Sequence, residues 1–151
     1  MAKLEIGHRA PDFTLPSSTG ENISLSQFLG KKRVVLFFYP MDESPVCSRE
    51  AEAFRDKIET FNEVGAEVLG ISSQSVQSHK SFSQHHNLPY VLLSDLDNNV
   101  RRLYGVSSTF GIVPGRVTFV IDKEGKIKLI FSSQLQPAKH AKQALLALKK
   151  T

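Results

Sequence analysis

Residues 33–47 read RVVLFFYPMDESPVC, and this stretch decides the fold. Its first seven residues form an almost entirely apolar run, which is typical of a central strand covered on both faces. Pro40 ends the strand, because proline has no backbone N–H to donate to a sheet. Ser44 is then a favoured N-cap, and Pro45 is favoured at the first helical position. The stretch therefore predicts a buried strand, a short loop and a helix whose first turn carries Cys47.

The rest of the sequence alternates between strand and helix patterns. Apolar residues at helical spacing predict one helix over residues 44–64, closed by Gly65, with an inner face formed by Cys47, Ala51, Phe54, Ile58 and Phe61. Short extended pieces are expected at residues 13–15 and 23–25, strands at 66–71 and 90–93, helices at 75–86 and 98–104, and a hairpin over 117–131. A last helix is expected over residues 137–149, with Ala138, Ala141, Leu145 and Leu148 on its inner face.

This order predicts a single domain of the α/β class over residues 1–151. A central mixed β-sheet should be flanked by helices on both faces. The order of elements resembles the thioredoxin-like fold. Such a resemblance concerns the architecture, and by itself it says little about function.

Composition excludes several classes of function. The chain has 151 residues, of which 40% are hydrophobic and 23% charged, as in ordinary globular proteins. It has no apolar run near the roughly 20 residues of a membrane span and no secretory signal pattern, so we expect a cytoplasmic protein that does not bind membranes. A removed organelle transit peptide would leave no trace. The net charge is +4, but the basic residues are scattered, so no nucleic-acid partner is predicted.

Cys47 is the only cysteine of the chain. One thiol cannot form an internal disulfide or a multi-thiolate zinc site. The sequence predicts no metal site, because His79, His85 and His86 lack a convincing set of further ligands, and it predicts no cofactor. In the first turn of a helix, unpaired N–H groups and the helix dipole favour the reactive thiolate. A lone cysteine on an apolar helix face is, however, often a small buried hydrophobe.

Three motifs, in order along the chain, give evidence beyond the position of Cys47 in a helix. They are Phe-Tyr-Pro-x-Asp-x-Ser-Pro-x-Cys-x-x-Glu-Ala at residues 38–51 with Phe-Arg-Asp at 54–56, Gly-x-x-Ala-Pro-Asp-Phe at 7–13, and Gly-x-x-Pro-Gly-Arg-Val-Thr-Phe-Val-Ile-Asp at 111–122. Together they closely resemble the peroxiredoxin Q, or bacterioferritin comigratory protein, group of the peroxiredoxins. The resemblance implies a thiol-dependent peroxidase of antioxidant defence that reduces hydrogen peroxide and organic hydroperoxides.

The resemblance also implies roles for individual residues. Cys47 stands at the peroxide-attacking cysteine, Pro40 and Ser44 at the proline and the Thr/Ser of the active-site motif, and Arg116 at its arginine. Arg116 would supply positive charge and donors to the sulfur and the peroxide, and the Ser44 hydroxyl would orient the peroxide. Pro40 would shield the sulfur from water. Glu50, one turn along the helix, is a candidate for a residue that orients the arginine.

The sequence departs from the family pattern in three places. Many members carry a second, resolving cysteine, but Glu52 and Ser83 occupy its two usual positions, by nature or by an engineered replacement. The Cys47 sulfenic acid must then react with an external thiol, such as thioredoxin, glutaredoxin or glutathione. Val46 replaces the glycine that usually precedes the cysteine, which narrows the start of the helix.

Other functions remain open at this point. A cysteine hydrolase would need one of the five histidines beside Cys47, and the sequence places none of them there. A redox sensor would pass the same oxidation of Cys47 to a partner. A non-enzymatic partner-binding domain would keep only the fold, and Cys47 would then be dispensable. The family resemblance also implies a monomer.

Overall fold

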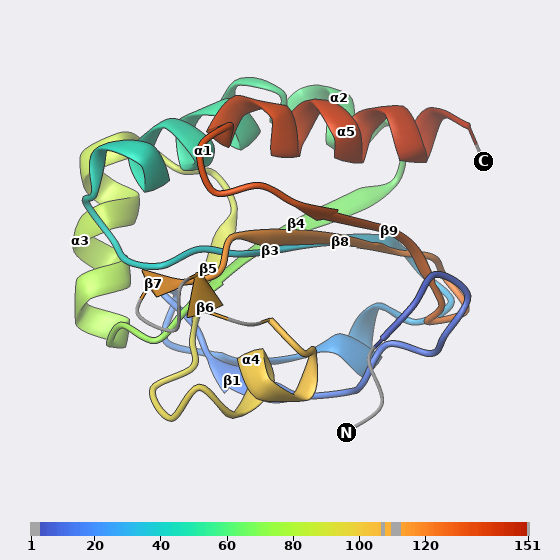
Figure 1. Ribbon diagram of the computed structural model, residues 1–151, viewed down its shortest axis with the longest axis horizontal. Coiled ribbons are helices and arrows are strands. Elements are labelled where there is room, and N and C mark those ends of the chain that lie inside the picture. Colours follow the sequence, from blue (N-terminus) through green and yellow to red (C-terminus); the bar gives the residue numbers. More distant parts are fainter. Residues whose placement is uncertain (1–3, 107, 110–112, 151) are drawn as a thin grey trace.

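A five-stranded sheet runs through the middle of the computed structural model, which describes residues 4–106, 108–109 and 113–150 (Figure 1). Its strands are β3 (Arg33–Phe38), β4 (Ala66–Ser72), β5 (Val91–Ser94), β8 (Val117–Ile121) and β9 (Ile127–Ser132). They lie in the order β5-β4-β3-β8-β9. Strands β3, β4 and β5 are parallel, whereas β8 is antiparallel to both β3 and β9. The sheet is therefore mixed, as predicted, and β3 is its central strand.

Strand β3 is buried on both faces because its side chains alternate between two hydrophobic cores. Val35 and Phe37 belong to one core, and Leu36 and Phe38 to the other. Phe37 stacks on Phe54 of the first long helix, with ring centroids 4.4 Å apart and an angle of 11° between the rings. The first core therefore ties that helix directly to the central strand.

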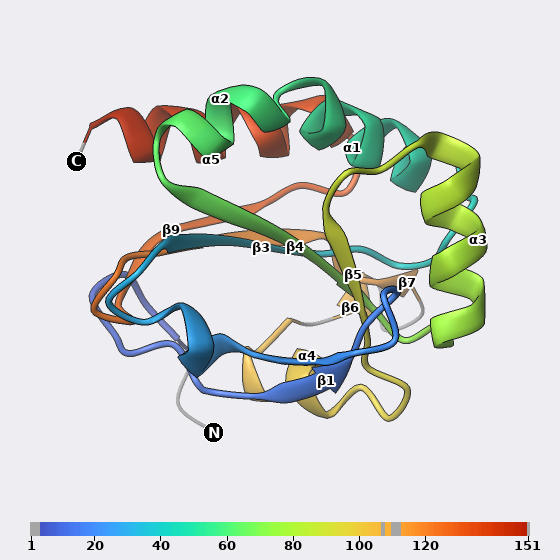
Figure 2. The same cartoon turned by 180° about the vertical axis from the view of Figure 1, so that it is seen from behind.

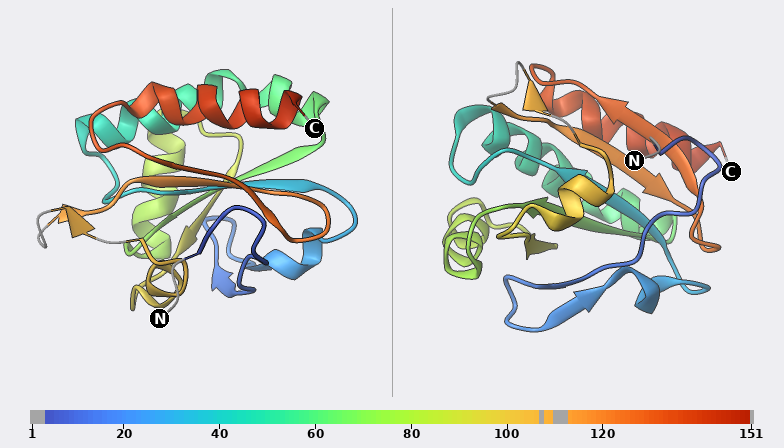
Figure 3. Two further views of the ribbon diagram at one scale, coloured as in Figure 1. Left: turned by 45° about the vertical axis from the view of Figure 1, so that its right-hand side comes forward. Right: turned by 60° about the horizontal axis from the view of Figure 1, so that its bottom comes forward.

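Helices and short elements cover the two faces of the sheet. On one face lie α1 (Pro45–Asp56), α2 (Ile58–Glu63) and α5 (Pro137–Lys149), with α3 (Val76–His86) packed beside β5 (Figures 1 and 2). The other face carries the hairpin of β1 (Thr14–Pro16) and β2 (Asn22–Ser24), the 3₁₀ helix η1 (Leu25–Phe28) and α4 (Asn99–Leu103) (Figure 3). Within the described ranges, no helix has both the length and the apolar character of a membrane span.

Most predicted elements are present, but some details differ, among them the 3₁₀ helix η1, which was not predicted. The helix predicted over residues 44–64 is interrupted at Lys57, where φ is −110° and ψ is 10°, so it forms α1 and α2. Ala138 is exposed, and His140 and Ala144 take inner positions on α5 instead. A small pair of strands, β6 (Ser108–Thr109) and β7 (Val113–Pro114), was not predicted. Gly111, which begins the third sequence motif, lies outside the described residues.

Gly70 of strand β4 packs without room for a side chain. A Cβ atom there would lie 2.8 Å from both Leu92 Cδ2 and Phe37 Cζ, closer than such contacts allow. We therefore expect Gly70→Ala to lower the free energy of unfolding by about 1–3 kcal/mol, measured by urea denaturation. Ser81→Ala on the exposed side of α3 is the control, with an expected change within about 0.5 kcal/mol. Equal stability of the two variants would contradict the tight packing at Gly70.

Candidate active site at the start of helix α1

Helix α1 begins as the sequence predicts. Ser44 is its N-cap in extended conformation, Pro45 is its first residue, and Cys47 is the third. The Ser44 hydroxyl oxygen accepts a hydrogen bond from the Cys47 backbone N–H at 3.3 Å, which satisfies one of the free donors of the first turn. The Cys47 side chain lies inside the protein, with 1% of the residue exposed.

Arg116 brings a buried positive charge to the sulfur. It directly precedes strand β8, and its Nη2 donates to Cys47 Sγ at 3.3 Å. Its Nη1 donates to Glu50 Oε1 at 2.7 Å, and its Nε donates to the carbonyl oxygen of Gln134 at 3.3 Å. Burial opposes the charged form of Arg116, but the attraction of Glu50 and of the sulfur outweighs it and raises the pKa of the guanidinium. The guanidinium therefore bridges helix α1 and the start of β8 as a permanent cation.

Glu50 and His140 form a second buried layer behind the arginine. Both side chains are fully buried, and His140 Nδ1 lies 3.4 Å from Glu50 Oε2, which has no hydrogen-bond partner among the described residues. Burial raises the pKa of Glu50 to about 8, although Arg116 pulls it down, and burial lowers the pKa of His140 to about 4. His140 is thus neutral, with Nε2–H donating to the Ser133 carbonyl and Nδ1 paired with the Thr118 hydroxyl at 2.8 Å. Sequence reasoning missed His140, because only the packing of α5 on α1 brings it near Glu50.

Arg116 contacts Glu50 and the sulfur of Cys47 at the same time. Glu50 accepts the hydrogen bond through Oε1, which it can do whether it is neutral or ionised. Glu50 thus stands where a residue that orients the arginine would be, and this role stays a prediction.

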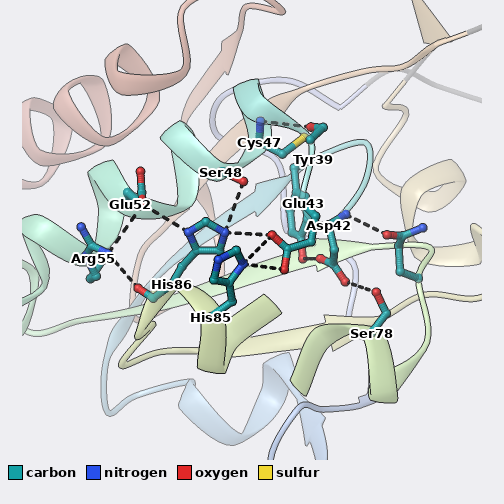
Figure 4. A network of polar contacts seen from close by, with 12 residues as sticks. Tyr39, Asp42, Glu43, Cys47, Ser48, Glu52, Arg55, Ser78, His85 and His86 are labelled. Atoms are coloured by element: carbon teal, nitrogen blue, oxygen red, sulfur yellow. Dashed lines mark hydrogen bonds and ion pairs between the residues drawn. The ribbon is translucent and has the colours of Figure 1, made fainter. Parts of the chain in front are cut away.

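The loop between β3 and α1 is anchored by Asp42, to which the sequence analysis gave no role. Its carboxylate accepts hydrogen bonds from Tyr39 Oη at 2.6 Å and Ser78 Oγ at 2.6 Å (Figure 4). It also accepts one from His79 Nδ1 at 2.7 Å. Burial alone would raise the pKa of Asp42, but these hydrogen bonds and the nearby His79 lower it. The loop that precedes Ser44 is therefore fixed to helix α3 through an ionised, largely buried carboxylate.

Arg101 of helix α4 joins the two segments of the site from the other side of the sheet. Its Nη2 donates to the carbonyl oxygen of Tyr39 at 3.0 Å, and its Nη1 donates to that of Gly115 at 2.8 Å. These residues stand directly before Pro40 and Arg116. Arg101 thus sets the spacing between the cysteine loop and the arginine segment, a role that sequence spacing alone could not reveal.

A shallow pocket of about 250 Å³ lies at the start of helix α1, beside Cys47. Its lining residues are Pro40, Met41, Ser44, Pro45, Val46, Arg116, Gln134 and Leu135. Three of the four residues expected to carry the chemistry, Pro40, Ser44 and Arg116, therefore border one pocket, and Arg116 reaches the fourth, Cys47. Leu135 is 81% exposed at its rim, so the approach is mostly apolar.

No histidine provides the hydrogen bond to the sulfur in the part of the chain that the structure describes. That bond comes from Arg116. Two histidines contact other residues of helix α1, which the sequence did not indicate. His86 Nε2 is 3.4 Å from Ser48 Oγ, and His140 approaches Glu50. Neither arrangement is the cysteine–histidine pair of a hydrolase, which needs a base on the nucleophile itself.

The chain matches the model of the AhpC/TSA family over residues 6–130, and it therefore belongs to that family. It is 49% identical over 146 residues to the chloroplastic peroxiredoxin Q of Suaeda salsa, a match that covers 96% of this chain and 68% of that protein. The structure of peroxidoxin BcpB from Mycobacterium tuberculosis is similar with a TM-score of 0.90 and 37% identity, and 97% of each chain is covered. Within the family, the chain is a one-cysteine member of the peroxiredoxin Q group, with a thioredoxin-like fold. It is thus a thiol-dependent peroxidase.

Glu50→Gln tests the raised pKa of the buried carboxyl group. Between pH 4.5 and about 8 the unfolded chain releases the Glu50 proton while the folded chain keeps it, so the free energy of unfolding falls as the pH rises. His140 acts in the opposite direction, but only between about pH 4 and 6.5. From pH 6.5 to 8, the wild type should therefore lose up to about 2 kcal/mol relative to Glu50→Gln in guanidinium unfolding. A difference that stays constant over this window would contradict the raised pKa.

Proposed function

We propose that Cys47 reduces peroxides by direct attack of its thiolate on the O–O bond, with Arg116 as the main stabilising group. One observation carries this proposal, the hydrogen bond of 3.3 Å from Arg116 Nη2 to Cys47 Sγ. The guanidinium stabilises the thiolate before the attack. Its planar array of donors can also stabilise the oxygen on which negative charge develops.

The reaction balances in three steps. The thiolate forms an S–O bond to one peroxide oxygen while the O–O bond breaks, and the leaving oxygen takes a proton to become water or an alcohol. Sulfur is oxidised to the sulfenic acid as the peroxide is reduced. An external thiol then displaces water from the sulfenic acid and forms a mixed disulfide. A second thiol releases Cys47 as the thiol and leaves the external pair oxidised.

Ser44 and Pro40 border the pocket and have different roles there. The Ser44 oxygen already accepts the Cys47 N–H, so its own O–H is free to donate to a peroxide oxygen in the pocket. Pro40 is buried at the pocket wall, where its ring keeps water from the sulfur. Glu50 positions Arg116 through their 2.7 Å contact.

The apolar approach to the pocket favours organic hydroperoxides beside hydrogen peroxide. Met41, Pro45, Val46 and Leu135 offer surface for an alkyl group next to the polar Ser44 and Arg116. The similar protein of Xanthomonas campestris, with 30% identity and a TM-score of 0.84 over 91% of this chain and 90% of that one, is described for its alkyl peroxide reduction activity. That description supports the same substrate class here.

The reductant comes from outside the chain, because Glu52 and Ser83 stand where a resolving cysteine could be. Thioredoxin, glutaredoxin and glutathione are the candidate thiols, and a sensor function would differ only in passing the oxidation to one partner. The chloroplastic names of relatives such as that of Suaeda salsa favour an organelle over the cytoplasmic location expected from the sequence. The monomeric state stays a prediction.

Cys47→Ser should abolish peroxide reduction, because no other thiol is present. Intact mass after brief exposure to equimolar peroxide provides the direct measurement. Wild-type protein should gain one oxygen, and an added thiol should replace that oxygen with a mixed disulfide. Thiol-dependent turnover by folded Cys47→Ser, checked by circular dichroism, would refute the mechanism. A Cys47 that stays unmodified in folded, reduced wild-type protein would support the partner-binding alternative.

Arg116→Ala should slow the oxidation of Cys47 by about 100-fold or more, because it removes the donor to both sulfur and peroxide. The thiolate fraction at neutral pH should fall as well, which ultraviolet absorbance at 240 nm reports. Arg116→Lys is the matched control. It keeps the charge but loses the planar fork, and should recover only part of the rate. An unchanged thiolate fraction in Arg116→Ala would show that the arginine does not act on the sulfur.

Val46→Gly should widen the pocket next to the helix start, where Val46 forms part of the wall. We expect the rate with cumene hydroperoxide to rise relative to that with hydrogen peroxide, by about tenfold or less. Competition between the two peroxides in stopped-flow experiments measures this ratio. A proportional change for both substrates would mean that Val46 affects the helix and not the access of bulky peroxides.

A further inference from the structure

We propose that Glu43, His85 and His86 form a binding site for one divalent transition-metal ion of the Zn²⁺ class. Glu43 lies in the loop directly before the N-cap of α1, and the two histidines end helix α3 (Figure 4). The site is separate from the pocket beside Cys47. It does not depend on the peroxidase mechanism, so a failure of either proposal leaves the other in place.

The donor atoms of the three residues already converge. Glu43 Oε1 lies 2.9 Å from His85 Nδ1 and 3.0 Å from His86 Nε2, and all three ligand atoms are within 4.8 Å of one another. Ligands of a tetrahedral zinc ion, at bond lengths of about 2.0–2.1 Å, are separated by about 3.3 Å. Only small outward shifts of exposed side chains are needed to admit an ion.

His86 faces a carboxylate through each of its ring nitrogens. Nδ1 is 3.2 Å from Glu52 Oε2, and Nε2 is 3.0 Å from Glu43 Oε1. Nε2 and Glu43 Oε1 are therefore close enough to bind the same metal ion, while Nδ1 stays turned toward Glu52.

The surroundings of His86 resemble the outer shell of known metal sites. A metal-binding histidine commonly donates its second N–H to a carboxylate, which fixes the ring and strengthens the ligand. Glu52 occupies this outer position, and Arg55 lies 3.8 Å from the same carboxylate oxygen. Arg55 Nη1 also donates to the His86 carbonyl at 2.7 Å, which holds the end of α3 against α1. The ring of His86, with 12% of its side chain exposed, is therefore preorganised before an ion binds.

The ligand set selects the class of ion. Two imidazoles and one carboxylate suit Zn²⁺, Co²⁺ or Ni²⁺, whereas Mg²⁺ and Ca²⁺ prefer all-oxygen sites. The side chains of His85 and Glu43 are 67% and 46% exposed, so water can occupy the fourth position. Sequence reasoning missed this site because the carboxylate ligand stands 42 residues before His85.

Binding should restrain the start of helix α1. The ion would connect residue 43, which directly precedes the Ser44 cap, to the end of α3. Glu52 in the second turn of α1 would be held to the same centre through His86. The metal would thus stabilise the folded chain, because it binds the native arrangement and not the unfolded one.

Isothermal titration with ZnCl₂ tests the site, in a Cys47→Ser background that removes the thiolate as a competing ligand. We expect saturable one-to-one binding, and at least about tenfold weaker binding for Glu43→Gln and for His85→Ala. Both changes are at exposed side chains and should leave the circular dichroism spectrum unchanged. His8→Ala, at an exposed histidine 3.8 Å from Glu5, is the matched control, with affinity within about twofold of the parent.

Two further measurements separate a built site from chance binding. Glu52→Gln keeps all three ligands but weakens their outer partner, and should reduce affinity about tenfold. Co²⁺ should give visible absorption bands of a four- or five-coordinate ion, and these should disappear in His85→Ala. Absence of saturable binding up to about 1 mM Zn²⁺, or equal affinity in the Glu43, His85 and His8 variants, would overturn the proposal.

Discussion

The contact between Arg116 and Glu50, 2.7 Å apart and almost completely buried, is the constraint on which the site depends. Removing the guanidinium charge from water is unfavourable, so it persists in the interior only where hydrogen bonds satisfy its donors. Here the arginine has three partners from different elements: Glu50 and Cys47 of helix α1, and the carbonyl of Gln134 after strand β9. The helix start and the sheet are therefore fixed relative to one another by the same side chain that faces the sulfur.

The sheet brings these groups together through its register. Phe38 of β3 pairs with Val117 of β8, so the residues just beyond each strand end, Tyr39 and Arg116, meet at one edge. Arg101 then fixes both segments through their backbone carbonyls. The stacked rings of Phe37 and Phe54 hold α1 over the same edge. Because β8 runs antiparallel to the central strand β3, Arg116 at its start lies beside the end of β3 and can reach Cys47.

Much of this arrangement can be predicted from the sequence, because it follows from local rules. The apolar run of β3 and the Ser44–Pro45 helix start are signals within a few residues, and both are confirmed. The break at Lys57 was missed because the apolar spacing continues across it. Asp42, Arg101 and His140 were missed for a different reason. Their partners are distant in sequence, and a buried polar residue has no periodic pattern to reveal it.

The burial of Cys47 has a consequence for how the enzyme is recycled. With 1% of the residue exposed, the sulfur cannot be contacted by the surface of another protein while helix α1 keeps this arrangement. If the reductant is a protein, its attack would require the first turn of α1 to open, whereas a small thiol would need a smaller opening. The free energy of that local opening would then select the size of the reductant. In a chain without a resolving cysteine, the stability of one helical turn would then determine which reductant reaches Cys47.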